Sequence, residues 1–244
     1  MTRLLILGGT GEAAALARHL ADRPGLEIVS SLAGRVAAPV LPPGAVRIGG
    51  FGGVEGLAAY LTQERIDAVI DATHPFAARM SANAAEACRR AGVPLLAFVR
   101  PAWAAEPGDR WHPVADMAAA AARCRGRVFL TVGRQELAPF AGSDAWFLIR
   151  SIDAPDGPLP AAHELLLKRG PFSLADEIDL LRDYRIDLIV SKNSGGPATY
   201  AKIEAARVLG LPVVLVARPA RPITDQVHSL DAAAAWLDRL AQTP

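Results

Sequence analysis

Short apolar segments alternate with helical patterns along most of this 244-residue chain. Strands of this kind, bounded by glycine or proline and separated by helices, are typical of βαβ units, in which helices cover both faces of a parallel sheet. The pattern predicts strands at residues 3–7, 26–32, 68–72, 94–99, 127–132, 145–150, 187–191 and 212–217. It predicts helices at residues 12–21, 53–64, 77–91, 115–124, 173–184, 198–209 and 230–241.

The two halves of the chain resemble each other. The segment IDAVIDATHPF at 66–76 matches IDLIVSKNSGG at 186–196, and CRRAGVPLLAFVRPAW at 88–103 matches ARVLGLPVVLVARPAR at 206–221. Any two βαβ units look somewhat alike, but the paired Arg-Pro endings favour a real repeat. We therefore expect an α/β fold with two Rossmann-like lobes, residues 1–104 and 105–244, each built on a parallel sheet, with a ligand cleft between them.

Composition limits the class of protein. The net charge of +1 gives no global attraction to nucleic acid or to a membrane surface. No apolar run is long enough to span a bilayer, and the first residues enter a strand rather than a signal peptide, so we expect a soluble, cytoplasmic protein. Cys88 and Cys124 form no CxxC pair, and we expect free thiols and no metal site.

A glycine-rich turn follows the first strand. In LLILGGTGEA, from Leu4, glycines let the backbone turn tightly, and the helix that follows directs its free N–H groups and positive dipole end at the space above. Such a turn between an N-terminal strand and a helix is typical of dinucleotide binding, although the third glycine of the usual pattern is replaced by alanine. We expect cofactor contacts from Gly9, Thr10, Gly11 and Glu12.

The second strand ends in SSLAGR, without the acid that holds the adenosine ribose of NAD. A carboxylate there would repel a 2′-phosphate, whereas Ser31 offers a hydroxyl and Arg35 a charged fork. Ser31, Gly34 and Arg35 therefore predict binding of NADPH or NADP rather than NAD. The alternative is that Arg35 is a solvated loop residue.

Polar groups also follow the strands at 68–72 and 187–191. Thr73 and His74 stand at the carboxyl end of the first, where open parallel sheets bind ligands, although a lone histidine is more often structural. In the second, SKNSGG precedes a helix in an anion-binding arrangement, for which the alternative is a helix cap with a solvated lysine. The candidate ligand residues there are Ser191, Lys192, Asn193, Ser194, Gly195 and Lys202. Arg134 and Arg169 lie in further turns of the same half.

Taken together, ILGGTGEA, DATHPFA, FVRPAW, TVGRQEL, KRGPFS and SKNSGG resemble the precorrin-6A reductase family of cobalamin biosynthesis, in order and in spacing. The resemblance implies NADPH-dependent reduction of one double bond in a precorrin macrocycle, with cofactor and substrate in a cleft between two lobes. That substrate carries many carboxylates, which call for distributed cations. Those available are Arg79, Arg100, Arg134, Arg169, Lys192 and Lys202. Neighbouring enzymes of the corrin pathway are the macromolecular partners to expect.

Two other functions stay open at this point. One is an NADP-dependent reductase of a smaller substrate, and the other is a dinucleotide-sensing protein without turnover. The sequence has no GxSxG, HExxH, P-loop or YxxxK motif, and no obvious acid–base pair. His74 and Lys192 are the only candidates for a catalytic proton donor, and solvent is an alternative. We expect the metal-free precorrin rather than its cobalt-containing counterpart as substrate.

Overall fold

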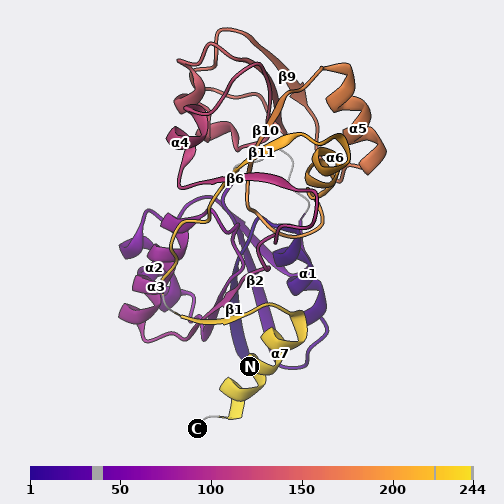
Figure 1. Ribbon diagram of the computed structural model, residues 1–244. Helices are drawn as coiled ribbons and strands as arrows, with labels where there is room; N and C mark the ends of the chain where they lie inside the picture. The colour runs from indigo at the N-terminus through magenta and orange to yellow at the C-terminus, as the bar shows by residue number, and fades with distance from the viewer. Residues whose placement is uncertain (35–40, 223, 243–244) are drawn as a thin grey trace. The chain divides into compact units, whose positions relative to one another are not determined.

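The computed structural model of the chain describes residues 1–34, 41–222 and 224–242 (Figure 1). The chain divides into two units: unit 1 consists of Met1–Pro101 and Pro219–Pro244, and unit 2 of Ala102–Arg218. Each unit contains one six-stranded sheet, and every strand pair in both sheets is parallel. The α/β class with two Rossmann-like lobes is therefore confirmed.

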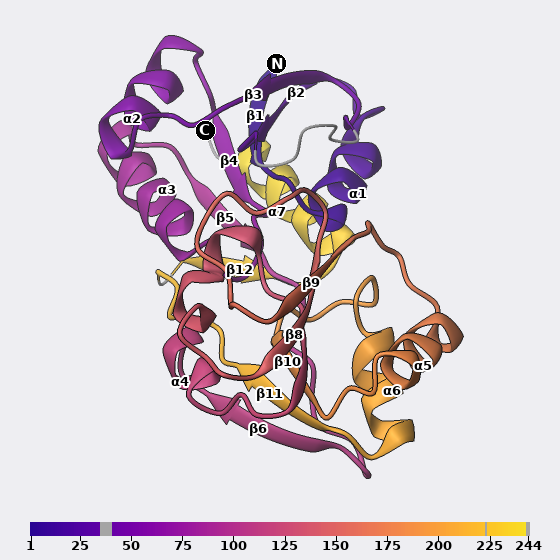
Figure 2. The same cartoon turned by 90° about the horizontal axis from the view of Figure 1, so that it is seen from above.

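Unit 1 is built on sheet A, whose strand order is β12-β5-β4-β1-β2-β3. Helices α1 and α7 lie on one face of this sheet, and α2 and α3 on the other (Figure 2). The strands are β1 (Thr2–Leu7), β2 (Leu26–Leu32), β3 (Ala45–Ile48), β4 (Ala68–Asp71), β5 (Leu95–Phe98) and β12 (Asp225–Val227). The helices are α1 (Gly11–Leu20), α2 (Val54–Gln63), α3 (Ala78–Ala91) and α7 (Leu230–Gln242).

Alternation along β1 shows how this sheet is buried on both faces. Leu4 and Ile6 pack with α1 and α7, whereas Leu5 and Leu7 pack with α2 and α3. Successive side chains of a strand point to opposite faces, so a strand buried on both sides reads as a continuous apolar run. This is why the first strand could be predicted from sequence.

Unit 2 is built on sheet B, whose order is β6-β11-β10-β7-β8-β9. Its core joins these strands to α5 and α6 through Phe129, Leu181 and Ile203. The strands are β6 (Arg110–Val114), β7 (Arg127–Leu130), β8 (Trp146–Ser151), β9 (His163–Leu167), β10 (Leu188–Lys192) and β11 (Pro212–Val216). The helices are α4 (Met117–Ala121), α5 (Leu174–Asp183) and α6 (Ala201–Leu209), with short 3-10 turns η1 (Arg134–Glu136) and η2 (Ala138–Phe140).

The internal repeat corresponds to equivalent positions in the two sheets. β4 lies between β5 and β1 in sheet A, and β10 lies between β11 and β7 in sheet B. Helices α3 and α6 both end at a glycine in the left-handed conformation, Gly92 and Gly210. Both repeat segments that begin with Ile-Asp, IDAVI at 66–70 and IDLIV at 186–190, follow an arginine with positive φ, Arg65 at 50° and Arg185 at 49°. These shared backbone details support a real repeat rather than a general βαβ likeness.

The extent of the second lobe differs from the expectation of 105–244. The first boundary falls at Pro101, close to the expected one, but the segment from Pro219 returns to unit 1. There β12 extends sheet A beside β5, and α7 buries Ala233 and Trp236 against β1 and α1. The C-terminal helix therefore closes the core of the first unit, because that unit has an apolar face that α1 alone does not cover.

Four strands, β3, β6, β9 and β12, were not predicted. β3, β9 and β12 are edge strands with no buried residue, and β6 is an edge strand whose single buried residue is Val114, so none shows a continuous apolar run. The stretch that follows the Arg-Pro ending at 100–101, for which no strand was predicted, supplies β6, which pairs with β11. Cys88 and Cys124 are free and buried, as expected, and burial raises their thiol pKa values to about 12 and about 11.

Candidate functional site

The strand register of unit 1 brings the predicted cofactor residues to one edge of sheet A. Leu7 at the end of β1 pairs with Ser31 of β2 on one side and with Asp71 of β4 on the other. Ser31 in turn pairs with Arg47 of β3. Because parallel strands all end at the same edge, the loops that follow these residues stand side by side. This carboxyl edge of sheet A is the first part of the candidate site.

The glycine turn between β1 and α1 has the geometry that its sequence predicts. Gly9 has a φ of +100°, which side-chain-bearing residues rarely adopt. Thr10 caps α1: its hydroxyl accepts a hydrogen bond from the Ala13 backbone N–H at 3.0 Å and donates one to the Ala72 carbonyl at 3.0 Å. A Cβ atom added at Gly9 or at Gly11 would meet no atom within 4 Å, so the space above both glycines is open. A pyrophosphate could approach the backbone there.

Glu12 and Arg100 form an ion pair over this turn. The Arg100 Nη1 lies 2.6 Å from the Glu12 Oε2, and both side chains are largely buried. Arg100 follows β5 and was predicted to bind substrate, whereas Glu12 was predicted to contact the cofactor. Their pairing neutralises a carboxylate that would otherwise repel a phosphate at the N-terminus of α1.

Asp71, the last residue of β4, is buried and organises the DATHP turn. Its Oδ1 accepts hydrogen bonds from the Thr73 N–H at 3.0 Å and from the Thr73 hydroxyl at 2.6 Å. Its Oδ2 accepts one from the Arg221 Nη2 at 2.5 Å. Arg221 was not foreseen as a site residue, because it comes from the returning segment, which lies 150 positions away in the chain. Its Nη1 is buried and has no hydrogen-bond partner among the described residues.

His74 has one ring nitrogen already committed. Its Nδ1 accepts a hydrogen bond from the Phe76 backbone N–H at 3.2 Å, and its ring lies 5.8 Å from that of Phe76. An accepting Nδ1 places the proton of the neutral imidazole on Nε2. Arg79, in the first turn of α3, is exposed.

Ser31 at the end of β2 is joined to an arginine that the sequence analysis passed over. The Arg47 Nη1 donates to the Ser31 hydroxyl at 2.9 Å. Gly34 has a φ of +69°, and a Cβ there would come within 3.3 Å of Ile48, so this turn requires glycine. Arg35, the predicted phosphate contact, lies outside the described residues.

The SKNSGG loop of unit 2 is held mainly by the chain itself. Asn193 and Trp103 exchange two hydrogen bonds: the Trp103 N–H donates to Oδ1 at 2.8 Å, and Nδ2 donates to the Trp103 carbonyl at 3.2 Å. Arg218 donates to the carbonyls of Asn193 and Ser194, both at 2.9 Å. Gly195, with a φ of +69°, belongs to the same turn. The Asn193 amide therefore positions the loop.

The cations of unit 2 occupy different environments. The Lys192 Nζ lies 2.6 Å from the Glu136 Oε2, which also accepts from the Gly133 N–H at 3.0 Å. Arg134 lies 3.7 Å from Asp156 and is about two-thirds buried, whereas Arg169 is exposed. The Lys192 ammonium, at the end of β10, thus shares its charge with a carboxylate.

Lys202 is not at the surface, contrary to what a direct substrate contact would need. It is 3% exposed, and its ammonium donates to the Thr199 carbonyl at 2.6 Å and lies 5.1 Å from the Trp103 ring. Burial, assisted by the charge of Arg150, lowers the Lys202 pKa to about 7, against an opposing effect of Glu177. Arg150 and Glu177 form a buried ion pair at 2.8 Å, without the geometry of a hydrogen bond. Ser191 is also buried.

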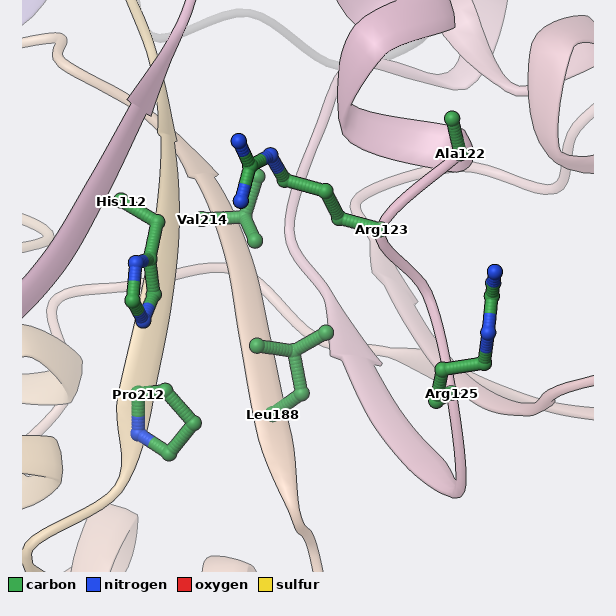
Figure 3. Close-up of a pocket in the computed structure, with 7 residues that line it drawn as sticks. All are labelled: His112, Ala122, Arg123, Arg125, Leu188, Pro212 and Val214. Atoms are coloured by element: carbon green, nitrogen blue, oxygen red, sulfur yellow. The ribbon is translucent and has the colours of Figure 1, made fainter.

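A separate hollow on unit 2 does not belong to this site (Figure 3). It lies beside Leu188 and Pro212, the first residues of β10 and β11, and is therefore at the opposite end of these strands from the SKNSGG loop. Within the described ranges, no three His, Cys, Asp or Glu side chains are grouped to hold a metal ion. None of the helices described is long and apolar enough to cross a membrane.

These features define a class: an α/β protein with two parallel sheets, whose first unit carries a glycine turn of the dinucleotide-binding kind and whose second carries a braced, partly cationic loop. The family model described as "Precorrin-6x reductase CbiJ/CobK" matches residues 3–238. The chain belongs to this family, and it is an oxidoreductase of cobalamin biosynthesis.

Individual relatives agree with that assignment. Precorrin-6A reductase of Rhodococcus erythropolis is 54% identical over 99% of this chain and 100% of its own length. The precorrin-6A reductase of Mycobacterium tuberculosis is 55% identical over 97% and 98%. Cobalt-precorrin-6A reductase of Salmonella typhimurium is 30% identical over 98% and 95%. A solved structure of CobK precorrin-6A reductase is 51% identical, with a TM-score of 0.93 over 100% of this chain and 99% of that one.

Proposed function

We propose that this chain uses NADPH to reduce a carbon–carbon double bond of precorrin-6A, giving the dihydro-precorrin precorrin-6B. The observation that carries the proposal is the likeness to precorrin-6A reductases along the full chain, at 54% identity over 99% of its residues in one case. The carboxyl edge of sheet A adds the chemistry that such a reductase requires.

The residues at this edge fit a dinucleotide. The open space above Gly9 and Gly11 would receive the pyrophosphate, next to the N-terminus of α1, which Thr10 caps. Ser31 lies near the end of β2, the position at which this fold contacts the adenosine ribose. Residues 30–34 include no carboxylate. Arg35 is proposed to contact the 2′-phosphate, and Gly34 to allow the turn that leads to it.

When bound, NADPH supplies a hydride to one carbon of the double bond, while the other carbon takes a proton. The chain's own contribution is orientation and electrostatics. Arg100 neutralises Glu12, so the negative phosphates meet an electrically balanced helix start. Thr73 is fixed by Asp71, and His74 is oriented by the hydrogen bond that its Nδ1 accepts from Phe76. These two residues are proposed to orient the cofactor or a substrate carboxylate.

Carboxylates of the macrocycle are proposed to meet the cations Arg79, Arg100, Arg134, Arg169 and Lys192, of which Arg79 and Arg169 are exposed. No direct substrate contact is proposed for Lys202, because its ammonium is buried beside Trp103. Ser191, Asn193, Ser194 and Gly195 shape that loop. The metal-free precorrin is favoured as substrate, because the relatives named for precorrin-6A reach 54% and 55% identity and the relative named for the cobalt form 30%.

The test is the loss of NADPH absorbance when purified protein is mixed with precorrin-6A, alongside the same assay with NADH. We expect turnover with NADPH and at least about tenfold tighter binding of NADPH than of NADH, since a charged hydrogen bond contributes roughly 1.5–3 kcal/mol. The Arg35→Ala variant should lose most of that preference. Binding of NADPH without oxidation would instead indicate a sensor, and oxidation with another substrate alone would indicate a different reductase.

A further inference from the structure

Arg47 occupies a position that the sequence does not single out. It lies in the middle of β3, the edge strand of sheet A, and the register places it directly beside Ser31. Ser31 is the last residue but one of β2, the strand after which this fold holds the adenosine ribose of a dinucleotide. Arg47 is half-buried, so its side chain is neither a free surface group nor part of the core.

The guanidinium of Arg47 is held in one plane. Nη1 donates to the Ser31 hydroxyl at 2.9 Å and to the Gly49 carbonyl at 3.0 Å, and Nη2 donates to the Gly50 carbonyl at 3.0 Å. The centre of the guanidinium lies 3.7 Å from the centroid of the Phe51 ring and 5.2 Å from that of Tyr60. Stacking on an aromatic face and bonding in its own plane fix the direction of the remaining N–H groups.

Arg47 and Ser31 both keep hydrogen-bond donors that are not used within this arrangement. A guanidinium has five N–H groups, and the three hydrogen bonds above leave Nε–H and one Nη2–H without an acceptor among the described residues. Ser31 accepts from Arg47 with its oxygen and keeps its own hydrogen for another acceptor. The charge of Arg47 also polarises that hydroxyl, which strengthens it as a donor. Arg47 has no carboxylate partner within the described part of the chain, so its charge is not cancelled there.

We propose that Arg47, together with the Ser31 hydroxyl that it holds, binds the adenosine 2′-phosphate and thereby selects NADPH over NADH. A phosphate dianion accepts several charge-assisted hydrogen bonds at once, which suits a preorganised guanidinium beside a hydroxyl donor. The inference rests on the proposed function, since it concerns the adenosine end of the same cofactor. It makes Arg47 a specificity-determining residue, with Phe51 as the surface that positions it.

The experiment measures binding of 2′,5′-ADP and of 5′-AMP by calorimetry, because these ligands differ only in the 2′-phosphate. The variants are Arg47→Gln, Arg47→Lys and Ser31→Ala. Arg110→Gln is the matched control, because Arg110 also lies on an edge strand, β6, and donates to a glycine carbonyl at 2.7 Å, but in unit 2. NADPH and NADH are titrated in the same way, and circular dichroism verifies that each variant is folded.

We expect Arg47→Gln to weaken 2′,5′-ADP and NADPH binding about tenfold or more, and to change 5′-AMP and NADH binding by less than about twofold. Arg47→Lys should keep part of the preference, because it retains the charge but not the planar fork. Ser31→Ala should lose a smaller part of the preference for ligands that carry the 2′-phosphate, and Arg110→Gln should lose none of it.

Equal weakening of all four ligands by Arg47→Gln would mean that Arg47 only braces the Gly49–Gly50 turn, and would overturn the inference. So would an unchanged preference in both Arg47 variants. A different result tests the proposed function itself: if the wild-type protein binds neither NADPH nor NADH, the cofactor assignment fails whatever Arg47 does. If Arg47→Gln does not fold, the Arg47→Lys and Ser31→Ala results decide alone.

Discussion

At the scale of single residues, the candidate site is held by side chains that bond to the chain as much as they face outward. Thr10 uses its hydroxyl both to cap α1 and to reach the Ala72 carbonyl. Asp71 receives three hydrogen bonds, and Asn193 exchanges two with Trp103. Groups fixed in this way need no reorganisation when a ligand arrives, which is the usual condition for effective orientation.

Gly9→Ala tests the glycine turn. The new Cβ meets no protein atom, but it requires a φ near +100° and occupies the open space proposed for the pyrophosphate. Gly25→Ala is a matched control, because Gly25 also has a positive φ, +74°, and open surroundings, but precedes β2 at the other end of the sheet. We expect each variant to lose about 1 kcal/mol in thermal unfolding. Only Gly9→Ala should weaken NADPH binding, by about tenfold or more; equal affinities in both variants would contradict the assignment.

Lys202 provides a test in pH. Its pKa is lowered to about 7 in the folded chain, so between that pH and the ordinary range of lysine the unfolded chain binds the extra proton. The free energy of unfolding should therefore rise with pH across this window, by at most about 1.4 kcal/mol per pH unit from this group.

The measurement is urea unfolding of wild type and Lys202→Met at several pH values from 6 to 9. The variant lacks the titrating ammonium, so its stability relative to wild type should be greatest at pH 6 and should fall as pH rises. Lys168→Met, which removes an exposed lysine, controls for loss of a positive charge. A difference between Lys202→Met and wild type that does not vary with pH would show that Lys202 stays charged.

At the scale of elements, an ion pair joins the segment that begins at Pro219 to the carboxyl edge of sheet A. Arg221 and Asp71 are 16% and 3% exposed, so their contact at 2.5 Å is shielded from solvent. The turn after β4 and the chain that leads to β12 are thereby held together. An isolated surface pair would contribute little, but a shielded pair leaves a costly unpaired charge when one partner is removed.

A double-mutant cycle on Asp71→Asn and Arg221→Gln measures this fastening. In urea unfolding, each single substitution should lower the free energy of unfolding by about 2–4 kcal/mol, and the double substitution should lower it by less than the sum of the two. The exposed pair Arg90 and Glu55 supplies the comparison cycle, in which no measurable coupling is expected. Additive losses for Asp71 and Arg221 would mean that the two side chains act independently.

At the scale of the whole molecule, the strands of the two sheets follow the same order, and each sheet has an edge strand that the sequence did not predict, β6 in unit 2 and β12 in unit 1. The segment after β5 enters unit 2 as β6, and the segment after β11 enters unit 1 as β12. Helix α7 then covers the face of sheet A that α1 leaves open, with Trp236 6% exposed and Ala233 fully buried. The C-terminal residues therefore contribute to the stability of the first unit.

Trp236→Ala tests that assignment by hydrogen exchange and mass spectrometry. Removing a buried tryptophan should lower the free energy of unfolding by about 3–5 kcal/mol. The loss of protection should be concentrated in β1, β4 and α1 of unit 1. Leu215→Ala, in the core of unit 2, is the control and should show the reverse pattern. A loss centred on unit 2 for Trp236→Ala would place the C-terminal helix in the second lobe after all.

The sequence by itself determined the elements that are buried on two faces. Continuous apolar runs such as those of β1 and β10 specify central parallel strands, and glycine or a capping hydroxyl marks the ends of helices, as at Thr10 and Gly92. The glycine turn, the DATHP and SKNSGG loops and the family resemblance follow from the same local patterns. These features are readable because each depends on residues close together in the chain.

Only the tertiary structure decided the edge strands, the return of the C-terminal segment and the partners of the site residues. β3 has no buried side chain, so nothing local marks it as a strand, and Arg47 could not be placed beside Ser31. The Asp71–Arg221 contact joins residues 150 positions apart, and the burial of Lys202 depends on Trp103, far away in the chain. Such pairings arise from packing between distant segments, which alternation and motif spacing do not encode.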